Sequence, residues 1–416
     1  MNNSTTSTAL KNKLTPAHRL LLLFLLISSP SFAKAPIMTL YLSTDQTGAQ
    51  ASSISIEQGI RTALSENNNQ LGGRRISLKT MDHRGNTVRA RKHFEAYLAD
   101  PNALAVFTGL HSPPLLAMRN FINEEGILVL DPWAAASPIT RYPSEKNWIF
   151  RLSIDDSKAG QVIVNHAVNK HAIKHPALLL EKTGWGKANQ KTMREAIDKA
   201  GLEIAKLSWF NWGLTNESAR ILLRQIIETG ADAIFLVANA PEGKVIARAM
   251  VSMPANKRLP IFSHWGITGG DFAETIDLTM RQQIQLEFIQ SSFSFLNPLN
   301  KFQRQAFDQA RKLYPGTISE TTDIKAPAGF IHAYDLTKLL IEAANKSPIK
   351  NDVVSTRMAL RNALENLHEP IEGLIKIYKK PFSTFSIHSP DAHEALNIND
   401  FTMGHYGDKN QILIGH

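Results

Sequence analysis

Two histidines with helical spacing are the first residues in this chain that could do chemistry. His171 and His175 are four residues apart, and this spacing can place two imidazoles on one face of a helix for zinc. No acidic residue lies between them, and Pro176 follows at once, where a strand is predicted to begin. The pair is therefore more typical of the cationic end of a helix than of a metal site.

A second pattern contains two of the three motifs of penicillin-interacting serine enzymes. These are Ser347-x-x-Lys350 and Lys182-Thr183-Gly184. In those enzymes the serine motif precedes the Lys-Thr-Gly strand, with a Ser-Asp-Asn motif between them, and neither condition holds here. Ser347 also precedes a proline at the end of a predicted helix, where serine is an ordinary helix terminator. The order of the motifs argues against this chemistry.

Other common catalytic signatures are missing from the sequence. It contains no Gly-x-Ser-x-Gly elbow, no Walker loop and no Gly-x-Gly-x-x-Gly turn. The absence of cysteine excludes disulfides, thiolate metal sites, cysteine nucleophiles and a lipid-modified N-terminal cysteine. We therefore predict a protein that is not an enzyme, with no catalytic residues, no metal and no cofactor.

Tryptophans recur in the loops that follow predicted strands. Trp133, Trp185 and Trp265 each lie in such a loop, at the edge of the sheet where open parallel sheets bind ligands. One such tryptophan is more often local packing than part of a ligand site. Three in equivalent places favour a shared aromatic cleft.

The elements that position these loops alternate between short apolar runs and longer helical patterns. This alternation predicts parallel sheets with crossover helices. The 416 residues are too many for one ordinary core. The first series has strands at 37–42, 76–82, 103–108, 126–130 and 148–152, with helices at 55–68, 88–99 and 113–125. The second has strands at 177–181, 202–209, 231–237, 260–264 and 284–291, with helices at 156–170, 187–200, 217–229 and 242–253. Further helices are predicted at 300–314, 328–345 and 353–367. The fold class is thus α/β, with two doubly wound, Rossmann-like lobes.

The N-terminal 33 residues are typical of a signal peptide. Three basic residues precede an apolar run of eight, Leu20 to Ile27, which is much shorter than the roughly 20 residues that span a bilayer. Ser31-Phe32-Ala33 fits the small-x-small rule, so we expect cleavage after Ala33 and export to the periplasm. A retained membrane anchor is the alternative. Removing the three basic residues lowers the formal net charge from +9 to +6. The remaining basic residues are scattered, so no nucleic-acid partner is expected.

An ordered set of segments resembles the type I periplasmic binding proteins, especially the leucine/isoleucine/valine-binding branch of the receptors of ABC transporters. The resemblance covers about residues 36 to 345. Its segments include Gln46-Thr47-Gly48, Asp82, Gly109-Leu110-His111-Ser112, Glu124-Glu125-Gly126-Ile127-Leu128, Pro132-Trp133-Ala134-Ala135, Phe150-Arg151, Trp185-Gly186 and Ala333-Tyr334-Asp335.

The resemblance implies two lobes joined by three crossings of the chain, which close on a ligand by hinge motion. It places the crossings near residues 153, 287 and 398. The predicted first lobe is then 34–153 with 288–398. The predicted second lobe is 154–287 with 399–416.

The resemblance also implies a set of ligand-binding residues. Ser112 falls where the family's serine binds a ligand carboxylate, beside His111, although a plain helix cap is the alternative. Trp133, Ala134 and Ala135 fall on the loop whose backbone binds both ends of an amino acid. Ala135 departs from the usual serine or threonine.

In the second lobe the departure at Trp265 is the most informative. This residue replaces the acid that pairs with the ligand ammonium, and an unpaired buried ammonium costs several kcal/mol. Asp131 or Glu242 could take its place. Trp185 and Asn239 fall where the family has further contacts to the ligand.

These residues predict a solute-binding protein that delivers a small organic ligand to an ABC permease in the inner membrane. The expected ligand has a carboxylate or other polar head on Ser112 and an apolar or aromatic body among the tryptophans. A cation enclosed by their rings is the alternative ligand. The alternative function is a ligand-sensing subunit that signals occupancy to a membrane receptor or regulator.

Overall fold

The computed structural model describes residues 1–2, 36–350 and 352–415, and the fold outlined below is that of the compact unit from Ile37 onward. Its described residues form a six-stranded sheet, a seven-stranded sheet and a short two-stranded ribbon. The six-stranded sheet has the order β2-β3-β1-β4-β5-β6. Its strands are β1 Met38–Thr44, β2 Gln70–Leu71, β3 Arg74–Asp82, β4 Ala103–Thr108, β5 Val129–Asp131 and β6 Ile149–Arg151.

The seven-stranded sheet has the order β15-β14-β11-β10-β9-β7-β8. It is parallel from β11 to β8, while β14 and β15 are antiparallel. Its strands are β7 Pro176–Glu181, β8 Lys206–Phe210, β9 Ala233–Val237, β10 Ile261–Ser263, β11 Leu286–Ser291, β14 Phe401–Tyr406 and β15 Ile412–Ile414. The ribbon pairs β12 Ile371–Glu372 with β13 Ile377–Tyr378.

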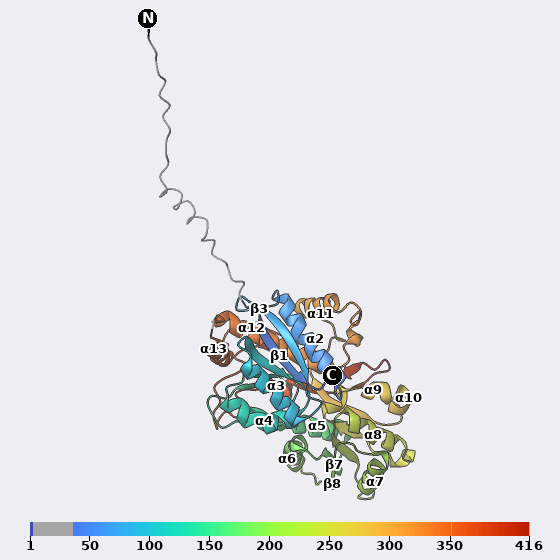
Figure 1. Cartoon of the computed structure of the whole chain (residues 1–416). Helices are drawn as coiled ribbons and strands as arrows, with labels where there is room; N and C mark the ends of the chain where they lie inside the picture. The colour runs from blue at the N-terminus through green and yellow to red at the C-terminus, as the bar shows by residue number, and fades with distance from the viewer. Residues whose placement is uncertain (3–35, 351, 416) are drawn as a thin grey trace. The chain divides into compact units, whose positions relative to one another are not determined.

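Each large sheet has its own helices, and we call each sheet with its helices a lobe. Figure 1 shows α7, α8, β7 and β8 at the opposite end of this unit from α2, α11 and α12. The first lobe has α2 Gln50–Glu66, α3 Thr87–Ala99, α4 Ser112–Glu124, α11 Lys301–Leu313, α12 Pro327–Lys346 and α13 Val353–Glu365. The second has α5 Asp156–His171, α6 Gly184–Lys199, α7 Asn216–Ile227, α8 Ala240–Val251, α9 Phe272–Thr275 and α10 Leu278–Arg281.

Glycine allows one of the closest helix contacts in the first lobe. α2 packs along α12, and a Cβ on Gly59 would lie 2.3 Å from the backbone oxygen of Phe330. No side chain fits there unless the two helix backbones move apart.

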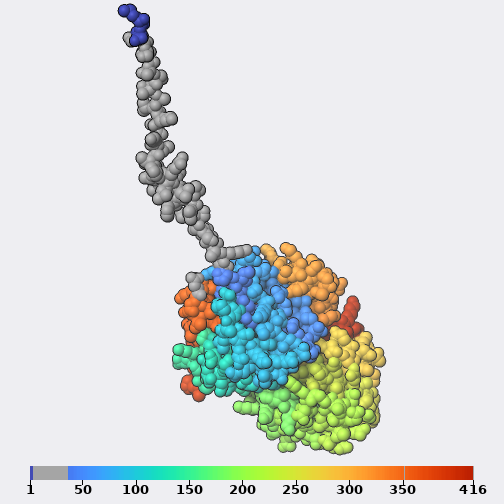
Figure 2. Space-filling view, in the orientation of Figure 1, coloured from blue at the N-terminus to red at the C-terminus, as the bar shows by residue number. Residues whose placement is uncertain are grey.

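The chain passes between the lobes after β6, after β11 and before β14. In Figure 2 the segment near residues 300–350 lies with the N-terminal part of the folded unit, apart from residues 160–280. The predicted second boundary at residue 287 falls inside β11. Because Phe288 to Ser291 pair with β14, these residues belong to the second sheet, and the crossing follows Ser291.

The predicted alternation of strands and helices is observed, with ends that differ by a few residues. Strand β4 occupies the predicted 103–108, and all six of its residues are buried, as expected for a central parallel strand. The prediction did not include β2, β12, β13, β14 or β15. Strand β14 carries polar and glycine residues among its apolar ones, so its sequence lacks a continuous apolar run.

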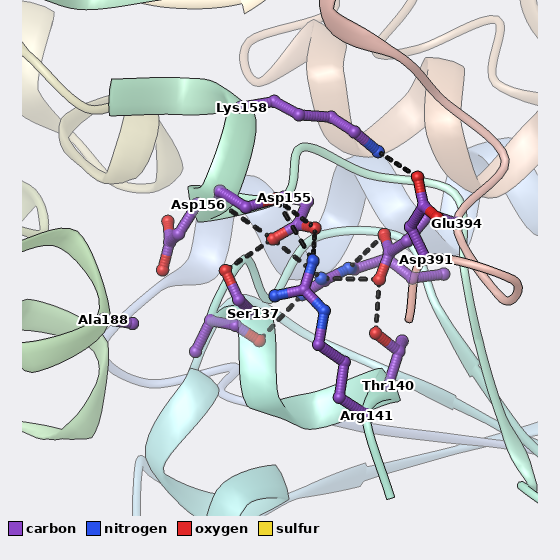
Figure 3. A network of polar contacts seen from close by, with 12 residues as sticks. Ser137, Thr140, Arg141, Asp155, Asp156, Lys158, Ala188, Asp391 and Glu394 are labelled. Atoms are coloured by element: carbon purple, nitrogen blue, oxygen red, sulfur yellow. Dashed lines mark hydrogen bonds and ion pairs between the residues drawn. The ribbon is translucent and has the colours of Figure 1, made fainter. Parts of the chain in front are cut away.

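A fully buried arginine connects two of the crossings. The guanidinium of Arg151 donates to Glu394 at 2.8 and 2.7 Å and to the backbone oxygens of Ala134 and Ala136 at 3.1 and 3.0 Å. It also lies 3.4 Å from the Asp155 carboxylate. Figure 3 shows Asp155 and Glu394 in this network, together with Ser137, Thr140 and Arg141.

Within the described residues, the helices are too short or too polar to cross a membrane. Residues 3–33 of the predicted signal peptide, including its expected cleavage site, lie outside the described residues.

Candidate functional site

A pocket of about 160 Å³ lies between the two lobes, next to the carboxyl ends of β1, β3, β4, β8 and β9. This is the edge at which open α/β sheets bind ligands. Both lobes contribute to the lining, so the pocket depends on how the two sheets face each other. Its polar and aromatic lining includes Asp45, Arg84 and His111 from the first lobe and Trp212, Asn239 and Glu242 from the second.

A carboxylate hydrogen-bonded to an imidazole forms the first-lobe side of the pocket. Nε2 of His111 lies 2.8 Å from Oδ2 of Asp45, while Oδ1 of Asp45 accepts the backbone N–H groups of Thr47 and Gly48. Burial opposes ionisation of Asp45, but the hydrogen bonds from His111 and Gly48 lower its pKa to about 2. Asp45 is therefore a negative charge in the pocket at every physiological pH.

Neutral histidines lie behind this pair. The ring of His83 is 6.0 Å from that of His111, and burial, together with the charge of His111, lowers the pKa of His83 to about 3. His93 hydrogen-bonds to Ser43 at 2.8 Å, and burial lowers its pKa as well. These two rings add polarisable surface and no positive charge.

The second lobe contributes an exposed indole and two carboxyl groups. The ring of Trp212 lies 5.6 Å from that of His111, so the two lobes touch across the pocket. Glu242 accepts the backbone N–H of Gly213 at 2.9 Å, which ties the Trp212 loop to α8. Beneath it, Asn239 donates to the fully buried Glu181 at 3.1 Å, and burial raises the pKa of Glu181.

Two of the eight predicted ligand-binding residues, His111 and Asn239, line this pocket. The other six are buried and are not among its lining residues: Ser112, Trp133, Ala134, Ala135, Trp185 and Trp265.

The three predicted tryptophans lie near one another but contact protein groups. The rings of Trp133 and Trp265 pack at 5.3 Å. Trp185 makes an edge contact with His264 at 5.0 Å, and its indole nitrogen donates to Asp156 at 3.3 Å. In this conformation the indoles fill the space between the lobes themselves.

The predicted backbone contacts are also occupied by protein groups. The N–H groups of Trp133 and Ala134 donate to Oδ1 of Asp131 at 3.1 and 2.8 Å. The Ser112 hydroxyl accepts the N–H of Ala136 at 3.2 Å, and the oxygen of Ala135 accepts the N–H of Asp156 at 2.9 Å. A ligand at this loop must displace some of these hydrogen bonds or use lone pairs that they leave free.

Comparison with known proteins gives the family. Residues 41–393 match the family model described as "Periplasmic binding protein". The chain belongs to this family. This match confirms the predicted family and its two-lobed fold. It also confirms the prediction that the chain is not an enzyme, because the family is one of binding proteins.

Individual relatives of this periplasmic binding protein are distant. A Leu/Ile/Val-binding protein homolog from Brucella melitensis is 22% identical to this chain. The match covers 47% of this chain and 52% of the homolog, so the chain spans about half the length of this curated relative. A type 1 periplasmic binding protein from Bordetella pertussis has a TM-score of 0.76, with 16% identity over 91% of this chain and all of the other. An ABC-transporter solute-binding protein from R. palustris in complex with 4-hydroxybenzoate has a TM-score of 0.72, with 14% identity over 91% of this chain and 95% of its own.

Three of the polar and aromatic lining residues of this periplasmic binding protein were not singled out from its sequence: Asp45, Arg84 and Trp212. Trp212 follows a strand end, as the three predicted tryptophans do, and the same argument applied to β8 would have found it. Asp45 directly follows the end of β1, so the same argument applies to it. Glu242, named as a substitute for the missing acid, does line the pocket.

Buried Asp131, which supports the predicted loop of this periplasmic binding protein, makes stability depend on pH. Burial raises its pKa to about 7, although Arg151 and the two loop N–H groups oppose the shift. Between about pH 4 and pH 7, Asp131 therefore holds a proton in the folded protein that it has lost in the unfolded chain. The free energy of unfolding falls as pH rises through this range, by up to about 1.4 kcal/mol per pH unit. Asp131→Asn keeps Oδ1 as acceptor and should remove this slope.

Urea unfolding of both proteins at pH 5 and pH 7.5 measures the effect. The variant should gain stability relative to the unsubstituted protein at the higher pH. An equal difference in unfolding free energy at the two pH values contradicts the assignment.

Proposed function

We propose that this periplasmic binding protein captures a small organic solute between its lobes and delivers it to an ABC importer. The observation that supports this function is the pocket that both lobes line at the carboxyl ends of their strands. The bound aromatic acid of the R. palustris relative supports a small organic ligand and an ABC-transporter role. Export to the periplasm, with cleavage after Ala33, and an inner-membrane permease as partner complete the proposal.

The charges of the pocket favour a ligand with a cationic group. Asp45 is ionised and contacts the His111 imidazole, and Glu242 is a second carboxyl group in the lining. Arg84 is the one arginine among the six polar and aromatic lining residues named above. Its guanidinium lies 3.3 Å from the Asp82 carboxylate, and its side chain is more than half exposed. Asp45 and Glu242 would pair with a ligand ammonium group in place of the acid that is absent at Trp265.

The shape of the pocket favours a small apolar or aromatic body. A cavity of ~150 Å³ can hold a benzene ring, so the pocket of about 160 Å³ has room for a ligand of comparable size. Leu110, Trp212 and Pro241 supply apolar surface, and Trp212 is accessible enough to cover a ligand. The proposed ligand is therefore a small amine or amino acid. The predicted contacts to Ser112, Trp133, Ala134, Ala135, Trp185 and Trp265 remain the alternative site, suited to a carboxylate head.

Calorimetry against a library of amines, amino acids and aromatic acids tests the proposal, with native mass spectrometry of any compound that copurifies. The Trp212→Ala variant should weaken binding of the best amine about tenfold, because it removes a cation–π partner and apolar cover. Trp212→Phe retains a ring and should restore most of the affinity. A tight ligand that binds Trp212→Ala unchanged contradicts this pocket, and failure of the whole library to bind contradicts the function.

A further inference from the structure

Two histidines and a glutamate converge on the second lobe, in a cluster separate from the ligand pocket. His166 and His171 belong to α5, and Glu287 belongs to β11. Nε2 of His166 lies 2.6 Å from Oε2 of Glu287, and Nε2 of His171 lies 2.9 Å from Oε1. The three ligand atoms all lie within 4.8 Å of one another.

The cluster differs from the pair considered in the sequence. His171 does join a group of metal-ligating residues, but its helical partner is His166, and His175 is exposed. The two rings are 5.2 Å apart. His171 is the last residue of α5, where Ala172 takes a left-handed conformation (φ 54°). The acid comes from a strand more than a hundred residues later, so no local motif shows the three together.

The donor types and their spacing fit a divalent transition metal. Zinc is bound by two histidines and one glutamate in some enzymes, and bonds of about 2.0–2.2 Å separate its ligand atoms by roughly 3.3 Å. The present contacts of 2.6 and 2.9 Å need to widen by less than about 1 Å to admit the ion. With neutral imidazoles the cluster carries one negative charge, which favours a dication.

A neighbouring side chain can support one of the ligands. The amide nitrogen of Gln285 lies 2.9 Å from Nδ1 of His171 and donates to Oε1 of Glu287 at 3.2 Å. Turning this amide by 180° would place its oxygen against Nδ1, where it accepts the Nδ1 proton and leaves the Nε2 lone pair for a metal. Such partners orient ligating histidines in many metal sites.

The surroundings give the cluster a rigid base and access to solvent. Phe262 lies beneath it, with its ring 6.1 Å from that of His166 and 5.0 Å from that of His171. The three side chains are only 20–27% exposed. Glu287 also lines a hollow of about 260 Å³ with Gln285 and His405, through which an ion and a water ligand can enter.

From this geometry we propose that His166, His171 and Glu287 bind a divalent transition metal ion such as zinc. The ion joins the end of α5 to β11. Because α5 begins at the crossing between the lobes, the ion would stabilise the second lobe at a distance from the ligand pocket.

Isothermal titration calorimetry of the untagged chain with zinc tests the proposal. We expect one ion per chain with micromolar or tighter affinity, and a rise in the thermal midpoint with zinc. Cobalt should give visible absorption bands of a nitrogen- and oxygen-ligated ion.

Variants separate this site from other histidines. His166→Ala and Glu287→Gln should each weaken zinc binding at least about tenfold, and circular dichroism checks that both still fold. His388→Ala removes an exposed histidine outside the cluster, and Asp45→Asn alters the pocket; both should leave zinc affinity unchanged. The proposal is overturned by absence of zinc binding, by unchanged affinity in the cluster variants, or by its loss in either control.

Discussion

Arg151→Ala is expected to lower the free energy of unfolding by about 3–5 kcal/mol, because it leaves buried charges without a partner. The guanidinium makes four hydrogen bonds, two of them to Glu394, and both side chains are almost completely buried. Without the arginine, the carboxylates of Glu394 and Asp155 stay in the interior with less compensation. Most of the variant should then fail to stay folded at moderate urea concentrations.

Urea unfolding followed by circular dichroism measures this loss. Arg141→Ala is the matched control, since Arg141 pairs with the same Asp155 but is one-quarter exposed. The loss in this variant should be smaller, because Asp155 keeps its contacts to Ser137, Ser157 and Arg151. If the two variants lose equal amounts of unfolding free energy, burial does not make the Arg151 network more stabilising than the partly exposed Arg141 pair.

Asp45→Asn is expected to weaken binding of a cationic ligand about 30-fold or more. Removing one partner of a desolvated charge pair costs at least about 2 kcal/mol. Asparagine keeps the Oδ1 acceptor for the N–H groups of Thr47 and Gly48, so the loop should hold its shape. The change is therefore confined to Oδ2, which contacts His111 and is replaced together with the charge.

Asp82→Asn is the control for this experiment, because Asp82 bonds to the same loop without lining the pocket. It should change affinity little. Ser112→Ala separates the two candidate sites. If this variant binds a carboxylate ligand more weakly and Asp45→Asn does not, the ligand binds at the loop of Trp133. The assignment of the site to the pocket lined by Asp45 is then wrong.

The fold could be predicted from sequence because parallel strands leave a simple signal. Buried on both faces, strands such as β4 and β7 appear as short continuous apolar runs between helical patterns. The antiparallel strands β14 and β15 leave no such signal. Their place is decided by pairing with β11, which is distant in the chain.

The site was predictable in part for the same reason. Strand ends identify which loops face the cleft, and His111 and Asn239 follow from that rule. The rule does not say where a side chain points. Trp133 and Trp265 lie at strand ends and close together, yet each indole contacts the other, and only the packing of both lobes decides this.

The pairing of Arg151 with Glu394 has a consequence for how the protein is made. Asp155 is only four positions from Arg151, but Glu394, which accepts two hydrogen bonds from the guanidinium, is 243 positions away. An N-terminal portion that folded alone would bury Arg151 without this second carboxylate, which is unfavourable. In the export that we propose, this buried network would be complete only after the last segment of the chain had crossed the membrane.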